Sequence, residues 1–202
     1  MESYNLVLYK KFLEVISKNL EEHFEAQKEY ICCKEGCSLC CRQGEYPCSE
    51  LEFEYLTIGF SYLSQEIHNI ILKNIEKIKK EKAEFKGEDY SYQCPFLIND
   101  KCSVYDYRMV VCRTFGLIYY NDTEKVGDSN PMKIPFCNEK GLNYSKVIDK
   151  ENKMISAEKV KALGYKNEPI GYNLNFKQLK EKVGKEMLGL NFGEEKTLIE
   201  WL

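Results

Sequence analysis

The stretch CKEGCSLCC, residues 33–41, holds four cysteines in nine residues. Cys37 and Cys40 are separated by two residues, the spacing at which one tight turn presents two thiolates to a metal ion. Cys33 adds a third sulfur four residues earlier, and Cys41 directly follows Cys40. Because adjacent side chains diverge, Cys40 and Cys41 are poorly placed to bind one mononuclear metal together. The stretch therefore favours a multinuclear site or two neighbouring sites.

All ten cysteines of the chain lie within residues 32–137, in two groups. The first group also includes Cys32 and Cys48, and the second consists of Cys94, Cys102, Cys112 and Cys137. Two predicted helices separate the groups, and a pair of helices that folds back would let the groups meet. A single site assembled from both groups is the economical expectation.

The rest of the composition excludes several classes of partner. A chain of 202 residues can bury a hydrophobic core without crosslinks, so its cysteines are not needed for folding. The net charge is −3, and the 29 basic and 32 acidic residues are spread along the chain, which argues against nucleic acid. No apolar run approaches the ~20 residues of a membrane-spanning helix. The first residues also lack the pattern of a secretory leader, so we expect a cytoplasmic protein without a membrane partner.

A cytoplasmic location favours metal binding or catalysis over disulfides, because cytosolic thiols are kept reduced. A zinc ribbon is disfavoured, since it needs two C-x2-C knuckles and the second group has none. The spacing C-x3-C-x2-C also holds three irons of a four-iron cluster in radical enzymes that use S-adenosylmethionine. Those enzymes belong to an α/β barrel and carry an aromatic residue where this chain has Leu39, so we reject that class. Zinc and iron–sulfur both remain open, with a slight preference for iron–sulfur.

Helical patterns dominate the first half of the chain. We expect one long helix over residues 4–30, where apolar residues recur every three or four positions. A second helix should begin at Ser49, since Glu52 completes a capping box, and Gly59 should end it. Ser64 should cap a third helix, which has an isoleucine stripe opposite a lysine-rich face.

The second half mixes short extended and helical segments. Asn99-Asp100 predicts the turn of a hairpin with Cys94 and Cys102 at its ends, and Asn121-Asp122 predicts a second short hairpin. A helical turn is expected over residues 106–112, and short helices without chemically reactive residues are expected after Ser156. The fold class is therefore mainly α, or α+β at most: a compact helical domain with small β-hairpin elements around a cysteine-rich metal site. Its predicted parts, within a single domain over residues 1–202, are an N-terminal helix in 1–31, a cysteine-cluster core in 32–137 and a C-terminal helical extension in 138–202.

Other residue types near the cysteines have weaker implications. Cations lower thiol pKa values and offset thiolate charge, and basic residues directly flank four cysteines, although chance placement could explain any one: Lys34, Arg42, Lys101 and Arg113. His23 and His68 are expected on surfaces or in packing, so a Cys-His nucleophile has little support. Tyrosines should mainly screen the second group from water: Tyr90, Tyr92, Tyr105, Tyr107, Tyr119 and Tyr120.

The order and spacing of eight cysteines resemble the YkgJ-like cysteine-cluster proteins, described as zinc- or iron-chelating domains and related to the flagellin lysine N-methylases. The resemblance lies in CKEGCSLCC, in CPFLINDKCSVYDYRMVVCRTFG (94–116) and in PFCNEKG (135–141), and it covers about half the chain. It extends to flanking residues: Pro95, Phe96, Tyr105, Arg108, Arg113 and Phe115. The resemblance implies a metal or iron–sulfur centre with eight ligands: Cys33, Cys37, Cys40, Cys41, Cys94, Cys102, Cys112 and Cys137.

Cys32 and Cys48 fall outside this set and are expected to be structural. The chain also departs from the family, with Met109 where the family often has proline. It is shorter than a flagellin methylase and lacks a glycine-rich loop for a methyl donor, so methyl transfer follows only by analogy.

Two functions from different classes remain open. The first is an iron–sulfur enzyme, or a redox component of one, acting on an unknown protein or small-molecule substrate. The second is a structural metalloprotein in which zinc closes the fold around a surface that binds a partner. No carboxylate pair, phosphate loop or acyl-transfer triad identifies a catalytic residue.

Overall fold

The computed structural model describes residues 3–34, 36–88, 90–120, 132–149, 151–152, 154–173 and 175–202. It is 52% helical with 9% strand, in small antiparallel sheets of two strands, which confirms a mainly α fold with some β structure. None of the helices in the described ranges combines the length and apolar character that a membrane crossing requires.

Helices and short strands alternate along the chain. The α-helices are α1 (Tyr4–Ala26), α2 (Leu39–Arg42), α3 (Glu50–Ser61), α4 (Gln65–Glu84), α5 (Val110–Thr114), α6 (Ala157–Ala162), α7 (Phe176–Gln178) and α8 (Leu198–Trp201). The 3-10 helices are η1 (Tyr105–Tyr107) and η2 (Phe136–Lys140), and a π-helix, η3 (Leu179–Met187), continues α7. The strands are β1 (Pro47–Ser49), β2 (Leu97–Ile98), β3 (Lys101–Cys102), β4 (Tyr119–Tyr120), β5 (Met132–Lys133) and β6 (Glu195–Thr197).

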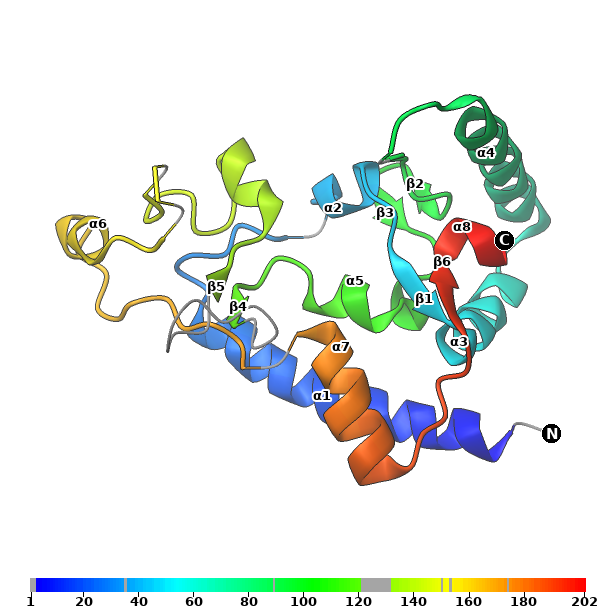
Figure 1. Cartoon of the computed structure of the whole chain (residues 1–202), viewed down its shortest axis with the longest axis horizontal. Helices are drawn as coiled ribbons and strands as arrows, with labels where there is room; N and C mark the ends of the chain where they lie inside the picture. Colours follow the sequence, from blue (N-terminus) through cyan, green and yellow to red (C-terminus); the bar gives the residue numbers. More distant parts are fainter. Residues whose placement is uncertain are drawn as a thin grey trace.

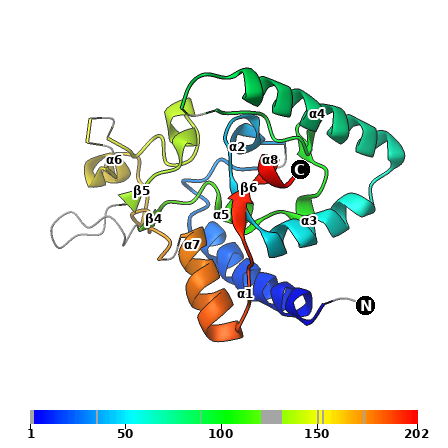
Figure 2. The same cartoon turned by 45° about the vertical axis from the view of Figure 1, so that its right-hand side comes forward.

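Helices α1 and α4 lie at opposite sides of the molecule, with α3 and the β1–β6 pair between them (Figures 1 and 2). The continuous helix α7–η3 packs across α1, and α6 lies at the end far from α4. Helix α1 buries the predicted apolar stripe, which forms one core with residues of η3 and the segment after it. It ends at Ala26, earlier than predicted. The next residue, the buried Gln27, caps the helix, and its side chain accepts a hydrogen bond from the amide of Ile170 (2.9 Å).

The predicted caps of the next two helices are present. Ser49 and Glu52 form the capping box of α3, and the Ser64 hydroxyl accepts from the amide of Ile67 at the start of α4. The prediction that Gly59 ends α3 is wrong, because the helix continues to Ser61. A Cβ at Gly59 would lie 2.4 Å from Cγ of Tyr107, so this glycine lets the Tyr107 ring pack directly on the helix backbone.

The hairpin predicted around Asn99-Asp100 is present as β2–β3. Leu97 pairs with Cys102 and Ile98 with Lys101, and the two turn residues have φ of 50° and 61°, as tight hairpin turns require. A second short hairpin was predicted around Asn121-Asp122, with its strands close together in the sequence. That prediction is wrong, because β4 pairs with the more distant β5 at Met132–Lys133. The predicted turn itself, Asn121-Asp122, lies outside the described residues.

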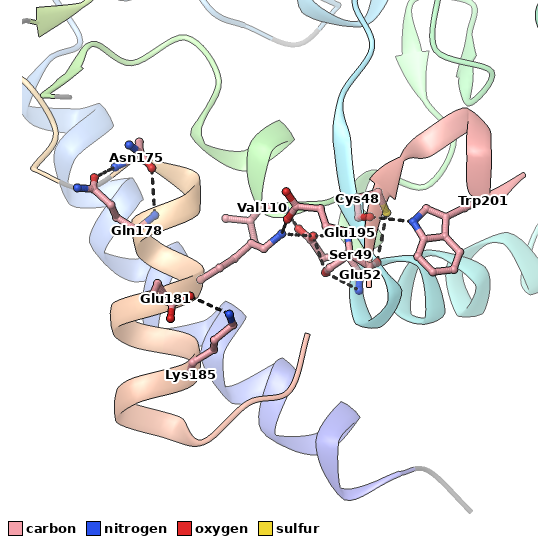
Figure 3. Close-up of polar contacts among 11 residues, drawn as sticks. Cys48, Ser49, Glu52, Val110, Asn175, Gln178, Glu181, Lys185, Glu195 and Trp201 are labelled. Atoms are coloured by element: carbon pink, nitrogen blue, oxygen red, sulfur yellow. Dashed lines mark hydrogen bonds and ion pairs between the residues drawn. The ribbon is translucent and has the colours of Figure 1, made fainter. Parts of the chain in front are cut away.

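The C-terminal segment contributes a strand that the sequence did not indicate. Strand β6 pairs antiparallel with β1, so that Cys48 faces Lys196 in the register. The helix that follows, α8, carries Trp201, whose indole N–H donates to the carbonyl of Cys48 (2.8 Å; Figure 3). The end of the described chain is thus attached to the strand that carries Cys48, the last cysteine of the first group.

Candidate metal centre

Five cysteines from distant segments approach one another, and we call them the five-thiol group: Cys40, Cys41, Cys94, Cys102 and Cys112. All five are half-buried. The sulfurs of Cys40 and Cys41 on α2 are 3.8 Å apart. The amide of Cys94, just before β2, donates to the carbonyl of Cys41 (2.7 Å). Charges on Cys40, Cys94 and Cys102 all act on the thiol of Cys112 in α5, which places these side chains in one electrostatic environment.

Helix α2 is fixed to the β2–β3 turn by polar contacts. Arg42 donates through Nε to the Ser38 hydroxyl (3.1 Å) and forms an ion pair with Asp100, and the same hydroxyl donates to Asp100 (3.1 Å). Arg42 therefore supports the local fold, and Asp100 already neutralises its charge. The predicted role of Arg42 as a direct counter-charge to the thiols is not supported by this arrangement.

Two cations act on the five-thiol group: Arg113 interacts with Cys112, and Arg108 interacts with Cys40, Cys102 and Cys112. Arg108 therefore reaches more of the group. Its guanidinium stacks 3.6 Å above the Tyr105 ring, and its buried Nε has no hydrogen-bond partner among the described residues. Burial raises the pKa of the thiols of Cys102 and Cys112, and the charge of Arg108 opposes that rise. Buried donors nearly always have a partner, so this nitrogen has a donor to spare for an acceptor outside the described residues.

The adjacent pair Cys40 and Cys41 loses its first proton easily. The thiol of Cys41 donates to the Cys40 sulfur, which lowers the pKa of Cys40 to about 7 despite burial. The same interaction, together with burial, raises the pKa of Cys41. Such a pair titrates as a unit, with one thiolate stabilised by the remaining S–H group. Burial also raises the pKa of the Cys94 thiol to about 12.

Aromatic side chains cover this group. The Tyr46 hydroxyl donates to the carbonyl of Cys40 (2.6 Å), and its ring meets Phe115 edge-on at 6.0 Å. Burial, followed by the charges of nearby thiols, raises the pKa of Tyr46. Tyr92 is also buried and packs in the core that includes Cys94. The prediction named Tyr92 but not Tyr46, which lies nearer to the first group in sequence.

A buried ion pair positions the helix that carries Cys112. Glu52 accepts from the amide of Val110 (2.9 Å), the first residue of α5, and from the Lys180 ammonium (3.1 Å). Lys180 also donates to Glu195 on β6 (2.5 Å); burial acts to lower its pKa, but the two carboxylates outweigh burial and raise it. Figure 3 shows Glu52, Val110 and Glu195 meeting between α5, α3 and β6. Lys180 and Glu195 could not be identified from the sequence, because nothing in their local pattern indicates burial.

We call the remaining predicted ligands, Cys33, Cys37 and Cys137, the three-thiol group. Cys137 is buried on η2, whereas Cys33 and Cys37 are exposed. Burial and then the charges of Cys33 and Cys37 raise the pKa of the Cys137 thiol to about 12. Burial raises the pKa of the Cys33 thiol, and a charge on Cys40 adds to that rise, so the two groups are neighbours. The eight cysteines thus gather in one region of the fold.

Asn143 holds Cys33 in place and was not identified from the sequence. It is fully buried, donates through Nδ2 to the Cys33 sulfur (3.2 Å) and the Gly116 carbonyl (2.8 Å), and accepts from the amide of Cys32 (2.7 Å). The next residue, Tyr144, is buried as well, and its hydroxyl has no hydrogen-bond partner in the described part of the chain.

The two cysteines outside the predicted set, Cys32 and Cys48, differ from each other in burial. Cys48 is completely buried in the apolar core beneath α4 and α8, while Cys32 is exposed. The histidines pack as predicted: His68 stacks on Phe60 at 4.3 Å, and His23 meets Tyr172 edge-on at 5.0 Å.

Among the described residues, no three Cys, His, Asp or Glu side chains are arranged to hold a metal ion as they stand. Comparison of the chain with protein-family models, curated proteins and solved structures finds no match. The resemblance to the YkgJ-like proteins therefore rests on the cysteine pattern and its flanking residues.

Proposed function

We propose that the chain is a cysteine-ligated metalloprotein of the YkgJ-like type and that the five-thiol group binds an iron–sulfur centre. The observation that supports this most is the surroundings of Arg108. Five half-buried cysteines from three segments share an environment with the half-buried Arg108, whose Nε is buried and has no partner among the described residues. A thiolate-bound metal centre carries net negative charge, which is what this cation lacks.

The donor set suits a soft metal. Sulfur ligands favour zinc, copper(I) and iron–sulfur clusters over the hard cations that carboxylates bind. The adjacent sulfurs of Cys40 and Cys41 favour a centre with more than one metal ion, because such a centre can use both. Since the thiols do not form a ligand sphere as they stand, binding must draw them closer together.

Arg108 and the aromatic cover would then tune the centre. A cation near the sulfurs stabilises the more reduced, more negative form, while exclusion of water acts in the opposite direction. An iron–sulfur centre supplies one-electron transfer or an open iron for substrate. We propose a redox component or a methyltransferase-related component in the cytoplasm, acting on a protein or small-molecule substrate.

The alternative is zinc in a structural role. The hydrogen bond between Cys94 and Cys41 favours it, because it shows that the group joins segments that are distant in the sequence. Zinc held by four sulfurs would stabilise that junction without any redox chemistry.

Anaerobic purification with metal and sulfide analysis tests the proposal. We expect a brown protein that contains iron and acid-labile sulfide and absorbs near ~400 nm. Cys94→Ser should lose the colour, whereas the matched variant Cys48→Ser, which alters a buried thiol outside the group, should keep it. A colourless protein with zinc would support the alternative, and less than one metal ion per chain would contradict both.

A further inference from the structure

We propose that an open hollow between α1, α3 and η1 binds a quaternary ammonium group against three tyrosine rings. The hollow has a volume of about 820 Å³, which is within the range of small-molecule sites. Its lining includes Tyr55, Tyr62 and Tyr107 together with Lys10 and Glu54. Among the described residues, no cysteine lines it. The inference therefore needs no metal, and its test can fail while the proposed function holds.

Tyr107 is the central ring of the three. Its centroid lies 5.0 Å from that of Tyr55, at an interplanar angle of 40°, and 6.2 Å from that of Tyr62, at 48°. Rings inclined in this way do not cover one another's faces, and all three border the hollow. The faces of aromatic rings carry partial negative charge, so a cation placed between such rings is attracted to several of them at once.

The central ring is held in place before any ligand binds. A Cβ at Gly59 would lie 2.4 Å from Cγ of Tyr107, so the ring rests on the backbone of α3 where a side chain would otherwise stand. The amide of Tyr107 also donates to the carbonyl of Val104 (2.9 Å), which fixes the backbone of η1. A wall that is already ordered loses little conformational entropy on binding, which favours affinity.

Tyr62 supplies an exposed ring at the edge of the hollow. It caps the C-terminal end of α3, and 75% of its surface is exposed. Burial of apolar surface is favourable, and a ring left in water beside a hollow has such surface to bury. Tyr62 can therefore lie against the methyl groups of a bound ligand while Tyr107 stays fixed.

The charged residues of the hollow act in opposite directions on a cation. Glu54 brings a carboxylate from α3, the same helix as Tyr55, and attracts it. Lys10 lines the hollow from α1 and repels it, although a long flexible stem lets the ammonium lie away from the rings. A quaternary ammonium fits this lining better than a primary one, because a primary ammonium is strongly hydrated and loses more on leaving water.

Calorimetric titration of the full chain with choline tests the inference, with 3,3-dimethyl-1-butanol as a probe of the same shape without charge. We expect choline to bind about 10-fold more tightly than the neutral alcohol. Equal affinities would mean a merely apolar hollow, and no binding of choline would mean no site, so either result overturns the inference. A peptide with one trimethylated lysine identifies the source of the group. Tighter binding of this peptide than of choline indicates a protein ligand, and the reverse indicates a small molecule.

Ring variants test the role of the tyrosines. Tyr107→Leu should weaken choline binding about 10-fold, whereas Tyr107→Phe keeps the ring face and should bind nearly as the wild type does. Tyr62→Leu should also weaken binding, and it leaves folding unaffected because the side chain is exposed. The matched control, Phe85→Leu, changes an exposed ring at the end of α4, away from α1, and should have no effect. Unchanged choline binding in both leucine variants of the tyrosines would overturn the assignment.

Charge variants test the same site without altering a ring. Glu54→Gln should weaken choline binding and Lys10→Met should strengthen it, each by about 2- to 5-fold at low salt, as expected for exposed charges. Binding of the neutral alcohol should be the same in both variants. Changes of the same sign in the two variants would contradict a cation bound between them.

Discussion

The backbone amide of Cys94 donates a hydrogen bond of 2.7 Å to the carbonyl of Cys41. The bond uses no sulfur, so it holds the two segments together whatever the thiols bind. Further contacts that involve no cysteine support the same region, such as the ion pair between Arg42 and Asp100. The scaffold of the five-thiol group therefore does not depend on metal.

Removal of metal should accordingly leave the fold intact. Under the iron–sulfur proposal, we expect the metal-free protein to keep its far-UV circular dichroism and a cooperative unfolding transition. The apolar core of α1, α3 and η3 contains no cysteine, and Cys94, Cys102 and Cys112 lie only at the edge of the second core. Collapse of the spectrum when a chelator is added would instead support the structural zinc alternative.

Lys180→Met should lower the free energy of unfolding by about 3 to 5 kcal/mol, because it leaves the buried carboxylate of Glu52 without its counter-charge. Urea denaturation of the metal-free protein measures the loss. The matched control is Lys185→Met on the same helix, whose exposed pair with Glu181 should contribute at most about 1 kcal/mol (Figure 3). Similar losses in the two variants would contradict the assigned role of the buried pair.

Asn99→Ala should destabilise the β2–β3 hairpin by about 1 kcal/mol, since alanine tolerates a positive φ less well than asparagine. Asn99→Gly should be neutral or slightly stabilising, because glycine adopts this conformation freely. Thermal unfolding of both variants measures the difference. A stable alanine variant would mean that the turn is not held in this geometry.

Alkaline pH should destabilise the metal-free protein. Burial raises the pKa of the thiols of Cys94 and Cys137 to about 12, above the ordinary value of 9.0. As pH rises, the unfolded chain loses these protons first, so the stabilising contribution is complete below pH 9.0 and is lost between there and about pH 12.

Each such thiol should lower the free energy of unfolding by about 1.4 kcal/mol per pH unit in that window. Urea denaturation at several pH values gives the slope. Cys137→Ala should make the slope shallower by one thiol, whereas Cys32→Ala, which removes an exposed thiol, serves as the control. A slope that changes equally in both variants would contradict the role of burial.

Gly116→Ala should disturb the contact between Asn143 and Cys33 in addition to straining the backbone. Gly116 and Gly141 have φ of +99° and +78°, so alanine at either costs about 1 to 2 kcal/mol. Only at Gly116 would the new Cβ meet Asn143 and Cys33, while Gly141 has open space. We therefore expect Gly116→Ala, but not Gly141→Ala, to weaken Co²⁺ binding by the metal-free protein, because Cys33 is one of the predicted ligands.

The helices and the first hairpin could be predicted because their signals are local. Ser49 with Glu52, the Ser64 cap and the Asn99-Asp100 turn each act within four residues, and all three are present. The predicted end of α3 at Gly59 was wrong because this glycine serves a tertiary contact. A glycine within a helix usually signals its end, but here it makes room for a ring from a distant segment.

The contacts of the individual cysteines could not be predicted, because spacing does not reveal which loops pack together. Cys33 and Cys41 lie eight positions apart, yet Asn143 contacts the first and the backbone of Cys94 contacts the second. The burial of Lys180 was hidden for a similar reason. Its helix is rich in lysine, and this one is buried beside Glu52 and Glu195, which come from distant segments of the chain.

The β1–β6 pairing also sets an order of events during synthesis. Residues 195–197 leave the ribosome after all ten cysteines. Strand β1, which carries Cys48, is therefore unpaired while the thiols are already outside the ribosome. A nascent chain of this protein therefore passes through a stage in which its soft ligands are accessible but its last strand is missing. Acquisition of metal before that strand pairs would use the open chain, and acquisition afterwards would use the exposed side of Cys33 and Cys37.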